Sequence, residues 1–294
     1  MNWFQEKLYE HHKQMLSMES VIYHWRTEFQ DVLIFENATF GKVLVLDGIV
    51  QLTERDNHIY HEMIAHVPML AHGSAQEVLI IGGGDGGTLR EVLKHPVERA
   101  TLVELDGEVI DLSRRHLPGI SERAFDDPRA SVLVMDGTRY IAETESMFDV
   151  IIIDSTDPMG PGEPLFTPAF YRACRSRLRP GGLIVVQSGA PFFQPANLEM
   201  VCGRLAASFS AVRPYLAPVP TYAGGMLALV AAGGSRDGLC PPCRVLRERF
   251  GALQGRTRYY VPEVHRAAFI LAPSFEPSSL REDPMPAGVL KSGA

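Results

Sequence analysis

Four apolar runs that alternate with segments of helical periodicity constrain the fold of this chain more than any other feature. The runs are EVLIIGGGDGG at residues 77–87, ATLVELD at 100–106, ASVLVMD at 130–136 and FDVIIIDSTDP at 148–158. Each run is apolar on both faces, which is typical of strands in a parallel sheet that helices cover on both sides. The sequence therefore predicts an α/β fold with a mostly parallel, Rossmann-like sheet.

The residues before this region have the pattern of a small antiparallel β-domain. Between residues 20 and 53, β-branched runs are separated by turn signals such as Gly41 and Asp47-Gly48, which favours hairpins. Helical spacing follows at residues 55–70. We accordingly divide the chain into an N-terminal β-hairpin domain (1–54), a Rossmann-like domain (55–273) and a loose C-terminal tail (274–294).

Further elements are expected beyond the four runs. The pattern predicts a strand at residues 181–189 and a helix at 197–209. Residues 212–225 and 226–232 resemble the antiparallel pair that can close such a sheet. Residues 233–243 read as a loop, and the segment 245–253 is predicted to be helical.

The composition excludes several classes of protein. With 46% hydrophobic residues, the chain matches an ordinary folded globular protein. The 28 Lys and Arg residues against 35 Asp and Glu residues give a net charge of −7 without a local basic patch, which argues against a nucleic-acid partner. No run reaches the ~20 apolar residues of a membrane helix, and the start of the chain is polar, so we expect a cytoplasmic protein without a membrane partner.

The four cysteines do not predict a disulfide framework or a metal site. Cys174 and Cys202 are isolated, and Cys240 and Cys243 have the CxxC spacing without a second pair. The only histidine near them in the sequence is His265, whereas a zinc site needs four ligands. We interpret the segment as a loop with two reduced thiols.

Polar residues follow the predicted strands at the point where each strand ends. Ligands of open α/β sheets bind at the carboxyl ends of the strands, so these residues are candidates for a site. None of them is Lys or Arg. They are Gly82 to Gly87, Glu104 to Asp106, Asp136-Gly137, Asp154 to Asp157, and Gln187-Ser188.

The first two strand ends have the pattern of an adenosine site. The glycines from Gly82 to Gly87 follow a strand and open a helix, as in a nucleotide-binding loop. Glu104 ends the next strand, where a carboxylate can accept both ribose hydroxyls, although a solvated acid remains the alternative. Asp106 suits a helix cap. Asp136-Gly137 ends the third strand, where related sheets read the adenine amino group.

Asp85 restricts which adenosine compound this site can take. A phosphate or carboxylate over the loop would meet the Asp85 carboxylate, and two like charges about 4 Å apart repel by roughly 4 kcal/mol at an effective dielectric near 20. A dinucleotide is therefore disfavoured. S-adenosylmethionine without its carboxylate keeps a primary amine that can pair with Asp85. The alternative is that Asp85 only caps the following helix.

The fourth strand delivers two further carboxylates, Asp154 and Asp157, to the same edge. A site lined by Asp85, Asp154 and Asp157 suits ammonium groups, and a carboxylate can take a proton from an attacking amine. Asp157 precedes a proline, so a turn-forming role is its alternative. The Pro-rich and Gly-rich residues after Asp157 could form a mobile flap.

At this point the motifs resemble those of spermidine synthases, the polyamine aminopropyltransferases. The resemblance runs from Trp3 to Pro273 and is carried by GGGDGG, VELD, DSTDPMGPGE, PTYAGG and the upstream TERD-HIYHEM. It implies a methyltransferase-type Rossmann-like sheet and the transfer of an aminopropyl group from decarboxylated S-adenosylmethionine to putrescine, with methylthioadenosine and spermidine as products. It also implies no metal or cofactor, and a homodimer or homotetramer.

The resemblance implies roles for individual residues. Asp154 would be the general base, Asp85 would hold the aminopropyl amine, and Asp157 would bind the far amine of the acceptor. The implied nucleoside-binding residues are Gln30, Gln51, Gly82, Glu104, Asp136, Gly137 and Pro161. The implied amine-binding residues are Tyr60, His61, Asp85, Asp154, Ser155, Thr156, Asp157, Gln187 and Tyr222.

Several alternatives stay open on sequence alone. His61 could merely pack beside His58, and Tyr222 could be a core aromatic residue. A small-molecule S-adenosylmethionine methyltransferase would use the same sheet and ribose acid, and a non-enzymatic polyamine sensor would keep the same acidic pocket. The acceptor could be putrescine, cadaverine, agmatine or spermidine, since one methylene changes binding by only about 1 to 3 kcal/mol.

Overall fold

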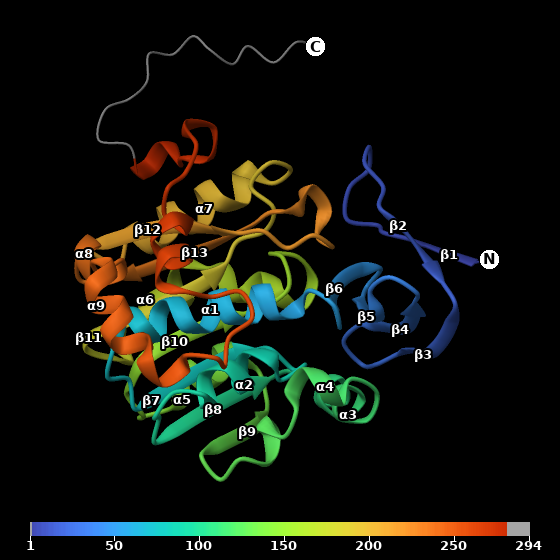
Figure 1. Ribbon diagram of the computed structural model, residues 1–294, viewed down its shortest axis with the longest axis horizontal. Helices are drawn as coiled ribbons and strands as arrows, with labels where there is room; N and C mark the ends of the chain where they lie inside the picture. The colour runs from blue at the N-terminus through green and yellow to red at the C-terminus, as the bar shows by residue number, and fades with distance from the viewer. Residues whose placement is uncertain (1, 281–294) are drawn as a thin grey trace.

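A seven-stranded sheet forms the centre of the computed structural model, which describes residues 2–280 (Figure 1). Its strand order is β12-β13-β11-β10-β7-β8-β9. All neighbouring pairs from β11 to β9 are parallel, whereas β13 is antiparallel to both β11 and β12. The strands are β7 (Glu77–Gly82), β8 (Arg99–Glu104), β9 (Ala130–Val134), β10 (Phe148–Asp154), β11 (Leu178–Gln187), β12 (Ala211–Ala217) and β13 (Leu227–Gly233).

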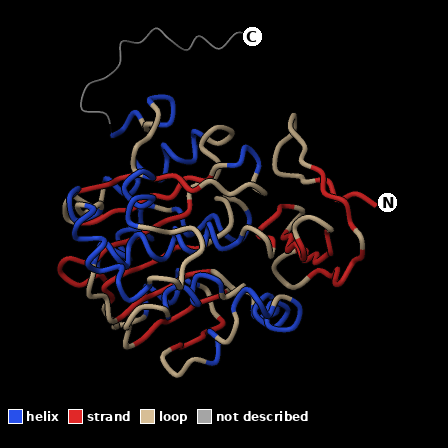
Figure 2. Tube along the Cα trace, in the orientation of Figure 1, coloured by secondary structure: helices blue, strands red, loops and turns tan. Residues whose placement is uncertain are grey.

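Helices cover both faces of this sheet (Figure 2). One core cluster joins a face of the sheet to α1 (Asn57–His72), α2 (Gly87–Leu93), α8 (Arg236–Leu239) and α9 (Cys243–Phe250). The other cluster joins the opposite face to α5 (Gly137–Glu143), α6 (Pro168–Ser176) and α7 (Pro195–Ala206). Along β10, Val150 and Ile152 belong to the first cluster and Ile151 and Ile153 to the second. This alternation explains why the run is apolar throughout.

The N-terminal region forms two antiparallel sheets beside the carboxyl ends of the central strands (Figure 1). The four-stranded sheet contains β3 (Ser20–Arg26), β4 (Asp31–Asn37), β5 (Gly41–Leu46) and β6 (Ile49–Thr53), and the two-stranded sheet contains β1 (Asn2–Gln5) and β2 (Met15–Met18). The four-stranded sheet packs on α3 (Gly107–His116) and α4 (Pro118–Ser121) through a shared apolar cluster. The N-terminal region is therefore packed firmly against the Rossmann-like domain.

The predicted fold class is confirmed: the central sheet is mostly parallel and the N-terminal region is antiparallel. The helix predicted at 55–70 is α1, and the predicted closing pair is β12 and β13. Pro214 lies inside β12, which is tolerated because β12 is an edge strand. The β1–β2 hairpin was not predicted, because its two strands are short and separated by a polar loop.

Two predictions about the C-terminal part need correction. The segment 233–243 is not all loop, because it contains the one-turn helix α8 capped by Ser235, and α9 already begins at Cys243. The first residues of the predicted tail are not loose, since the Ser278 amide and hydroxyl donate to Glu199 on α7. The remaining residues of that tail lie outside the described part of the chain. α10 (Pro262–Ala268) precedes it.

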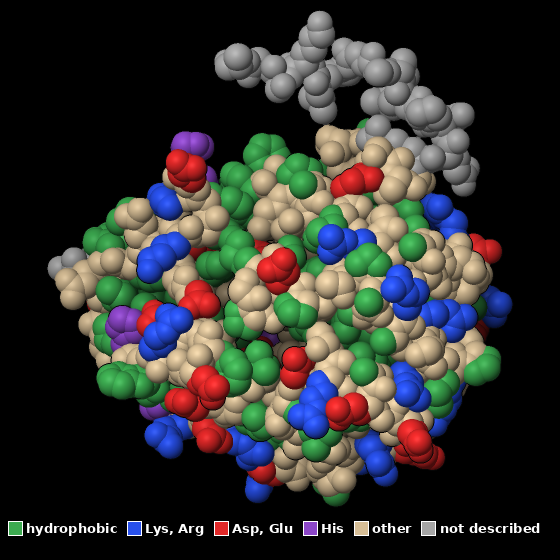
Figure 3. Space-filling model, turned by 180° about the vertical axis from the view of Figure 1, so that it is seen from behind, with side chains coloured by type: hydrophobic (Ala, Val, Ile, Leu, Met, Phe, Trp, Pro, Cys, Tyr) green, Lys and Arg blue, Asp and Glu red, His purple; other side chains and the backbone are tan. Residues whose placement is uncertain are grey.

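The charged surface is mixed rather than patterned. On the face turned towards the viewer in Figure 3, acidic and basic side chains are interspersed. In the described part of the chain, residues 2–280, no helix combines the length and the apolarity needed to cross a bilayer.

Candidate active site

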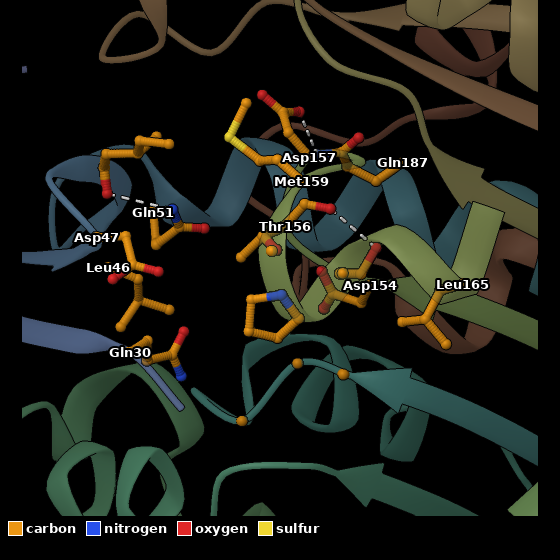
Figure 4. A pocket seen from close by; sticks show the side chains of 18 of the residues that line it. Gln30, Leu46, Asp47, Gln51, Asp154, Thr156, Asp157, Met159, Leu165 and Gln187 are labelled. Carbon is orange, nitrogen blue, oxygen red and sulfur yellow. Dashed lines mark hydrogen bonds between the residues drawn. The ribbon is translucent and has the colours of Figure 1, made fainter. Parts of the chain in front are cut away.

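A pocket of about 330 Å³ opens at the carboxyl ends of the central strands, where the N-terminal sheet covers them. Figure 4 shows Gln30, Leu46 and Gln51 on one side, and Asp154, Asp157 and Gln187 on the other. The first set comes from the N-terminal β-domain and the second from the Rossmann-like domain. The two regions of the chain therefore build one cavity together.

The glycine loop is held against the end of β10 by backbone contacts. The Gly83 amide donates to the Asp154 carbonyl at 2.9 Å. Gly82 has a φ of +86°, and a Cβ there would lie 2.1 Å from the same carbonyl oxygen. Only glycine fits such a conformation and such a close approach. The loop thus reaches the pocket without a side chain of its own until Asp85.

Glu104 lies at the carboxyl end of β8 with its carboxylate anchored to the neighbouring backbone. It accepts hydrogen bonds from the Gly84 amide at 3.1 Å and the Asp106 amide at 3.0 Å. Burial raises the pKa of Glu104 to about 7, against the effect of these hydrogen bonds. Asp106 caps α3, as predicted, and also accepts from the Gln30 amide at 3.0 Å.

The residues expected at the adenine end line the pocket from two sides. Asp136 caps α5 by accepting from the Thr138 amide and hydroxyl, both at 2.7 Å, and its side chain is exposed. At Gly137 a Cβ would lie 2.3 Å from Cγ2 of Ile81, so the backbone passes directly over the end of β7. Pro161 lies opposite, in the 3₁₀ segment Gly160–Phe166 that follows β10.

Asp154 is a buried carboxylate whose two oxygens both accept hydrogen bonds. It is 9% exposed. Oδ1 accepts from the Tyr60 hydroxyl at 2.5 Å, and Oδ2 accepts from the Thr88 hydroxyl at 2.6 Å. Burial, together with the nearby charge of Asp85, raises the pKa of Asp154 above its usual value. An oriented carboxylate with a raised pKa is well suited to accept a proton.

Asp85 faces Asp154 across the start of α2 and is paired with a histidine. Its Oδ1 lies 3.1 Å from Nε2 of His61 and accepts from the Gly87 amide at 2.7 Å. Burial works against ionisation of Asp85, but the His61 charge and these hydrogen bonds outweigh it and lower the pKa of Asp85. His61 therefore contacts Asp85 and does not only pack beside His58, while the bond from the Gly87 amide at the start of α2 agrees with a capping role for Asp85.

The far end of the pocket holds Asp157 between two glutamine amides. Gln187 donates to Oδ1 at 3.2 Å, and Gln194 donates to Oδ2 at 2.7 Å. Glu6 also reaches this end from the N-terminal region, where it accepts from the Val50 amide at 3.0 Å. Burial, with a smaller effect from Asp157, raises the pKa of Glu6.

Tyrosines complete the wall between the two ends. The Tyr222 hydroxyl donates to the Gln51 carbonyl at 2.6 Å, and its ring centroid lies 6.3 Å from that of Tyr60. Tyr222 is therefore a wall of the pocket, with its hydroxyl satisfied by the N-terminal sheet. Ser155 and Thr156 follow Asp154 along the same wall.

All the residues to which the resemblance gives a role line this one pocket, whereas Gly86, Gly87 and Ser188 of the strand-end candidates do not. The residues with an implied role are Gln30, Gln51, Tyr60, His61, Gly82, Asp85, Glu104, Asp136, Gly137, Asp154, Ser155, Thr156, Asp157, Pro161, Gln187 and Tyr222. Their individual roles remain predictions. Sequence reasoning missed Glu6, Tyr9 and Gln194 in the lining and Thr88 behind Asp154. Only Thr88 gave a signal, since it is the first polar side chain after the glycine loop.

The cysteine segment lies away from this pocket. Cys240 is buried, and the Cys243 thiol lies 3.6 Å from Glu263. Among the described residues, no group of three or more His, Cys, Asp or Glu side chains is arranged to hold a metal ion.

Comparisons with known proteins agree over nearly the whole chain. The family model described as spermine/spermidine synthase domain matches residues 57–237, and the model described as spermidine synthase tetramerisation domain matches residues 2–54. Polyamine aminopropyltransferase 1 of Pseudomonas aeruginosa is 50% identical over 273 residues, which cover 92% of this chain and 95% of that protein. The polyamine aminopropyltransferase of a Ruegeria species is 49% identical over 270 residues, covering 92% and 95%.

Solved structures give the same result. A spermidine synthase in complex with the transition-state analogue AdoDATO matches with a TM-score of 0.86 and 41% identity, covering 92% of each chain. The spermidine synthase of Thermotoga maritima matches with a TM-score of 0.84 and 39% identity, covering 92% of this chain and 91% of that one.

The fold, the acidic pocket and these similarities define an aminopropyltransferase that acts in polyamine biosynthesis. The chain belongs to the spermine/spermidine synthase family. The resemblance stated from the motifs is thereby confirmed, and it takes precedence over the methyltransferase and the non-enzymatic sensor as alternatives.

Proposed function

We propose that the enzyme transfers the aminopropyl group of decarboxylated S-adenosylmethionine to putrescine, giving spermidine and methylthioadenosine. The observation that carries the proposal is the alignment of Asp85, Asp154 and Asp157 along one pocket with Glu104 at its nucleoside end. Such a row of carboxylates suits a ligand with a sulfonium and several ammonium groups.

The choice of donor rests on Asp85. A primary ammonium can bind the Asp85 carboxylate, whereas the carboxylate of intact S-adenosylmethionine would be repelled by it. Glu104 would accept the ribose hydroxyls, and Asp136 and Gly137 would bind the adenine with Pro161 against its face. Gln30 and Gln51 would close this end from the N-terminal sheet.

The test of the donor is a pair of calorimetric titrations. Decarboxylated S-adenosylmethionine should bind at least tenfold more tightly than S-adenosylmethionine, and Asp85→Asn should reduce this ratio. Equal affinities in the wild-type protein would contradict the proposed donor.

Asp154 is proposed as the general base. The acceptor nitrogen forms a bond to the carbon beside sulfur, the electron pair of the carbon–sulfur bond goes to sulfur, and the proton of the attacking amine passes to Asp154. The leaving group is a neutral thioether, so the step requires neither a metal nor a further cofactor. Activity should accordingly be unchanged by a chelator.

Asp154→Asn should lower turnover by about 10²- to 10⁴-fold while methylthioadenosine still binds. The exposed Asp111 on α3 offers a matched control, since Asp111→Asn changes the same charge outside the pocket. A chirally labelled aminopropyl carbon should be inverted in the product. Net retention would instead indicate a covalent intermediate.

The acceptor is proposed to lie between Asp154 and Asp157. Its near amine would meet Asp154, its methylenes would pass Tyr60 and Tyr222, and its far ammonium would bind Asp157. A product assay with putrescine, cadaverine, agmatine and spermidine tests this choice. Putrescine should have the highest kcat/KM, and a higher value for spermidine would overturn the proposed acceptor.

We also infer a homo-oligomer formed through the N-terminal sheets. Large apolar side chains are exposed there, with Val21 at 53% and Trp25 at 68% on β3. The match of residues 2–54 to the tetramerisation domain model supports this surface. Trp25→Glu should lower the sedimentation coefficient, whereas Val134→Glu, at an apolar side chain exposed to 61% on β9, should not.

A further inference from the structure

His61 lies buried at the donor end of the pocket, with both ring nitrogens facing oxygen atoms. Its side chain is 1% exposed. Nε2 lies 3.1 Å from Oδ1 of Asp85, and Nδ1 lies 3.3 Å from Oδ1 of Asn57, one turn earlier on α1. Each ring nitrogen therefore faces an oxygen.

The orientation of the Asn57 side chain determines which protonation state of the His61 ring fits its surroundings. Its Nδ2 donates to the carbonyl oxygens of Thr53 and Glu54, both at 2.9 Å. The side-chain oxygen of Asn57 is thus the atom that faces His61, and it can only accept. Nε2 likewise faces a carboxylate. Both ring nitrogens can donate to these oxygens only in the imidazolium form, so this geometry favours a ring that carries both protons before the donor binds.

The ring has no room to turn away from Asp85. It lies directly over Gly87, where a Cβ would come within 2.2 Å of Cε1 of His61. The edge of the Tyr60 ring closes another side, with the ring centroids 5.4 Å apart. If ligand binding changes His61, the change is therefore in the number of protons on the ring and not in its rotamer.

The groups that face His61 come from three elements. Asp85 lies on the glycine loop, Asp154 at the end of β10, and Asn57 and Tyr60 on α1, while Arg90 on α2 acts on Asp85 from one turn beyond Gly87. The donor ammonium would bring a second cation to Asp85 beside the imidazolium, and the two like charges would repel each other.

Resting on the proposed function, we propose that His61 is the resident counter-ion of Asp85 and gives up one proton when the donor ammonium binds there. The neutral ring keeps its Nδ1 proton on Asn57, and the lone pair on Nε2 accepts a hydrogen bond from the incoming ammonium. The Asp85 carboxylate then has the ammonium as its partner in place of the imidazolium. The released proton passes to the buffer.

Isothermal titration calorimetry of the full-length protein tests this exchange. Decarboxylated S-adenosylmethionine is titrated at pH 6 in phosphate and in a buffer with a larger ionisation enthalpy, and the difference gives the number of protons released. Methylthioadenosine, which lacks the ammonium and the sulfonium, measures the protons that Glu104 gives up when a nucleoside binds at this pH. We expect the donor to release up to about one proton more than methylthioadenosine does.

Two variants locate the source of the proton. His61→Gln can still donate to Asp85 but cannot ionise, so its donor binding should release no more protons than the binding of methylthioadenosine. His24→Gln is the matched control, because His24 also lies 3.3 Å from an aspartate, Asp31, but on the exposed β3–β4 hairpin. Its proton release should equal that of the wild type.

The outcomes separate this inference from the proposed function. Wild-type protein that releases no more protons with the donor than with methylthioadenosine, or His61→Gln that keeps this extra release, overturns the role of His61 and leaves the proposed donor intact. Absence of donor binding overturns the proposed donor itself. Should His61→Gln fail to fold, the imidazole ¹⁵N shifts of the wild type serve instead, and they must change from imidazolium to the Nδ1–H tautomer on donor binding.

Discussion

The phenolic hydroxyl of Tyr60 lies 2.5 Å from Oδ1 of Asp154, although the two residues come from different elements that are distant in the sequence. Tyr60 is held by α1 and Asp154 by the end of β10. The Thr88 hydroxyl satisfies the other oxygen. The carboxylate is therefore oriented by two neutral donors while burial makes its ionised form costly.

Tyr60→Phe should impair catalysis through the protonation of Asp154. Loss of the hydroxyl removes a donor to the ionised form, which raises the pKa of Asp154 further and moves the rise in activity to higher pH. We expect kcat at neutral pH to fall about 10- to 100-fold, in line with a hydrogen bond to a charged group. Tyr215→Phe removes a buried hydroxyl that donates to Met63 and should leave the pH profile unchanged.

Glu104 predicts a pH dependence of nucleoside binding. Because burial raises its pKa to about 7, the carboxylate becomes protonated below that pH and loses its ability to accept both ribose hydroxyls. Affinity for methylthioadenosine should therefore weaken as the pH falls from 8 to 6. Glu104→Gln should bind more weakly at pH 8 and show a flat profile, whereas a profile as steep as the wild type would place the titration elsewhere.

The raised pKa of Glu104 also makes the stability of the folded protein depend on pH. The folded-state pKa of Glu104 lies above the value of 4.5 for a free glutamate, so its contribution to stability is present at low pH and is lost as the pH rises through about 7. Glu104→Gln should raise the melting temperature relative to the wild type more at pH 8 than at pH 5. Differential scanning calorimetry at the two pH values measures this difference.

Gln194→Ala should weaken binding of the acceptor while leaving the rate of the chemical step nearly unchanged. It removes the amide that donates to Oδ2 of Asp157, so the far carboxylate loses its fixed orientation while Asp154 is untouched. We expect the KM for putrescine to rise about 5- to 30-fold, as for one hydrogen bond to a charged group, with kcat changed less than threefold. Gln5→Ala, at an exposed position on β1, is the control.

Gly82 and Gly181 form a matched pair for the glycine loop. Their φ angles are +86° and +83°, but a Cβ at Gly82 would meet the Asp154 carbonyl at 2.1 Å, whereas a Cβ at Gly181 would meet nothing within 4 Å. Alanine at either position carries backbone strain of roughly 1–2 kcal/mol. Urea unfolding should show that Gly82→Ala loses at least about 2 kcal/mol more, and equal losses would contradict the close approach.

The sequence predicted those site residues that stand at the polar end of an apolar strand. Glu104, Asp136 and Asp154 end apolar runs, and parallel strands bring such ends to one edge, so periodicity alone placed them together. Tyr60 and Tyr222 needed the family resemblance, because nothing in helical or strand spacing points an aromatic side chain at a given carboxylate.

The remaining contacts depend on packing between distant segments. Glu6 reaches the pocket only because the β1–β2 hairpin forms, and Gln194 reaches Asp157 only because the loop after β11 folds back at Gly189. Neither side chain lies in a periodic pattern. Their positions follow from tertiary structure, and the local spacing of residues in the sequence does not predict such contacts.

The shared construction of the pocket has a consequence for how such an enzyme can diverge. Its nucleoside end is formed mainly by the central strands, whereas Glu6 and Tyr9 at the other end belong to the N-terminal β-domain. Substitutions in that domain can reshape the acceptor cavity while the donor machinery stays constant. Acceptor preference can then drift between lineages without passing through an inactive ancestor.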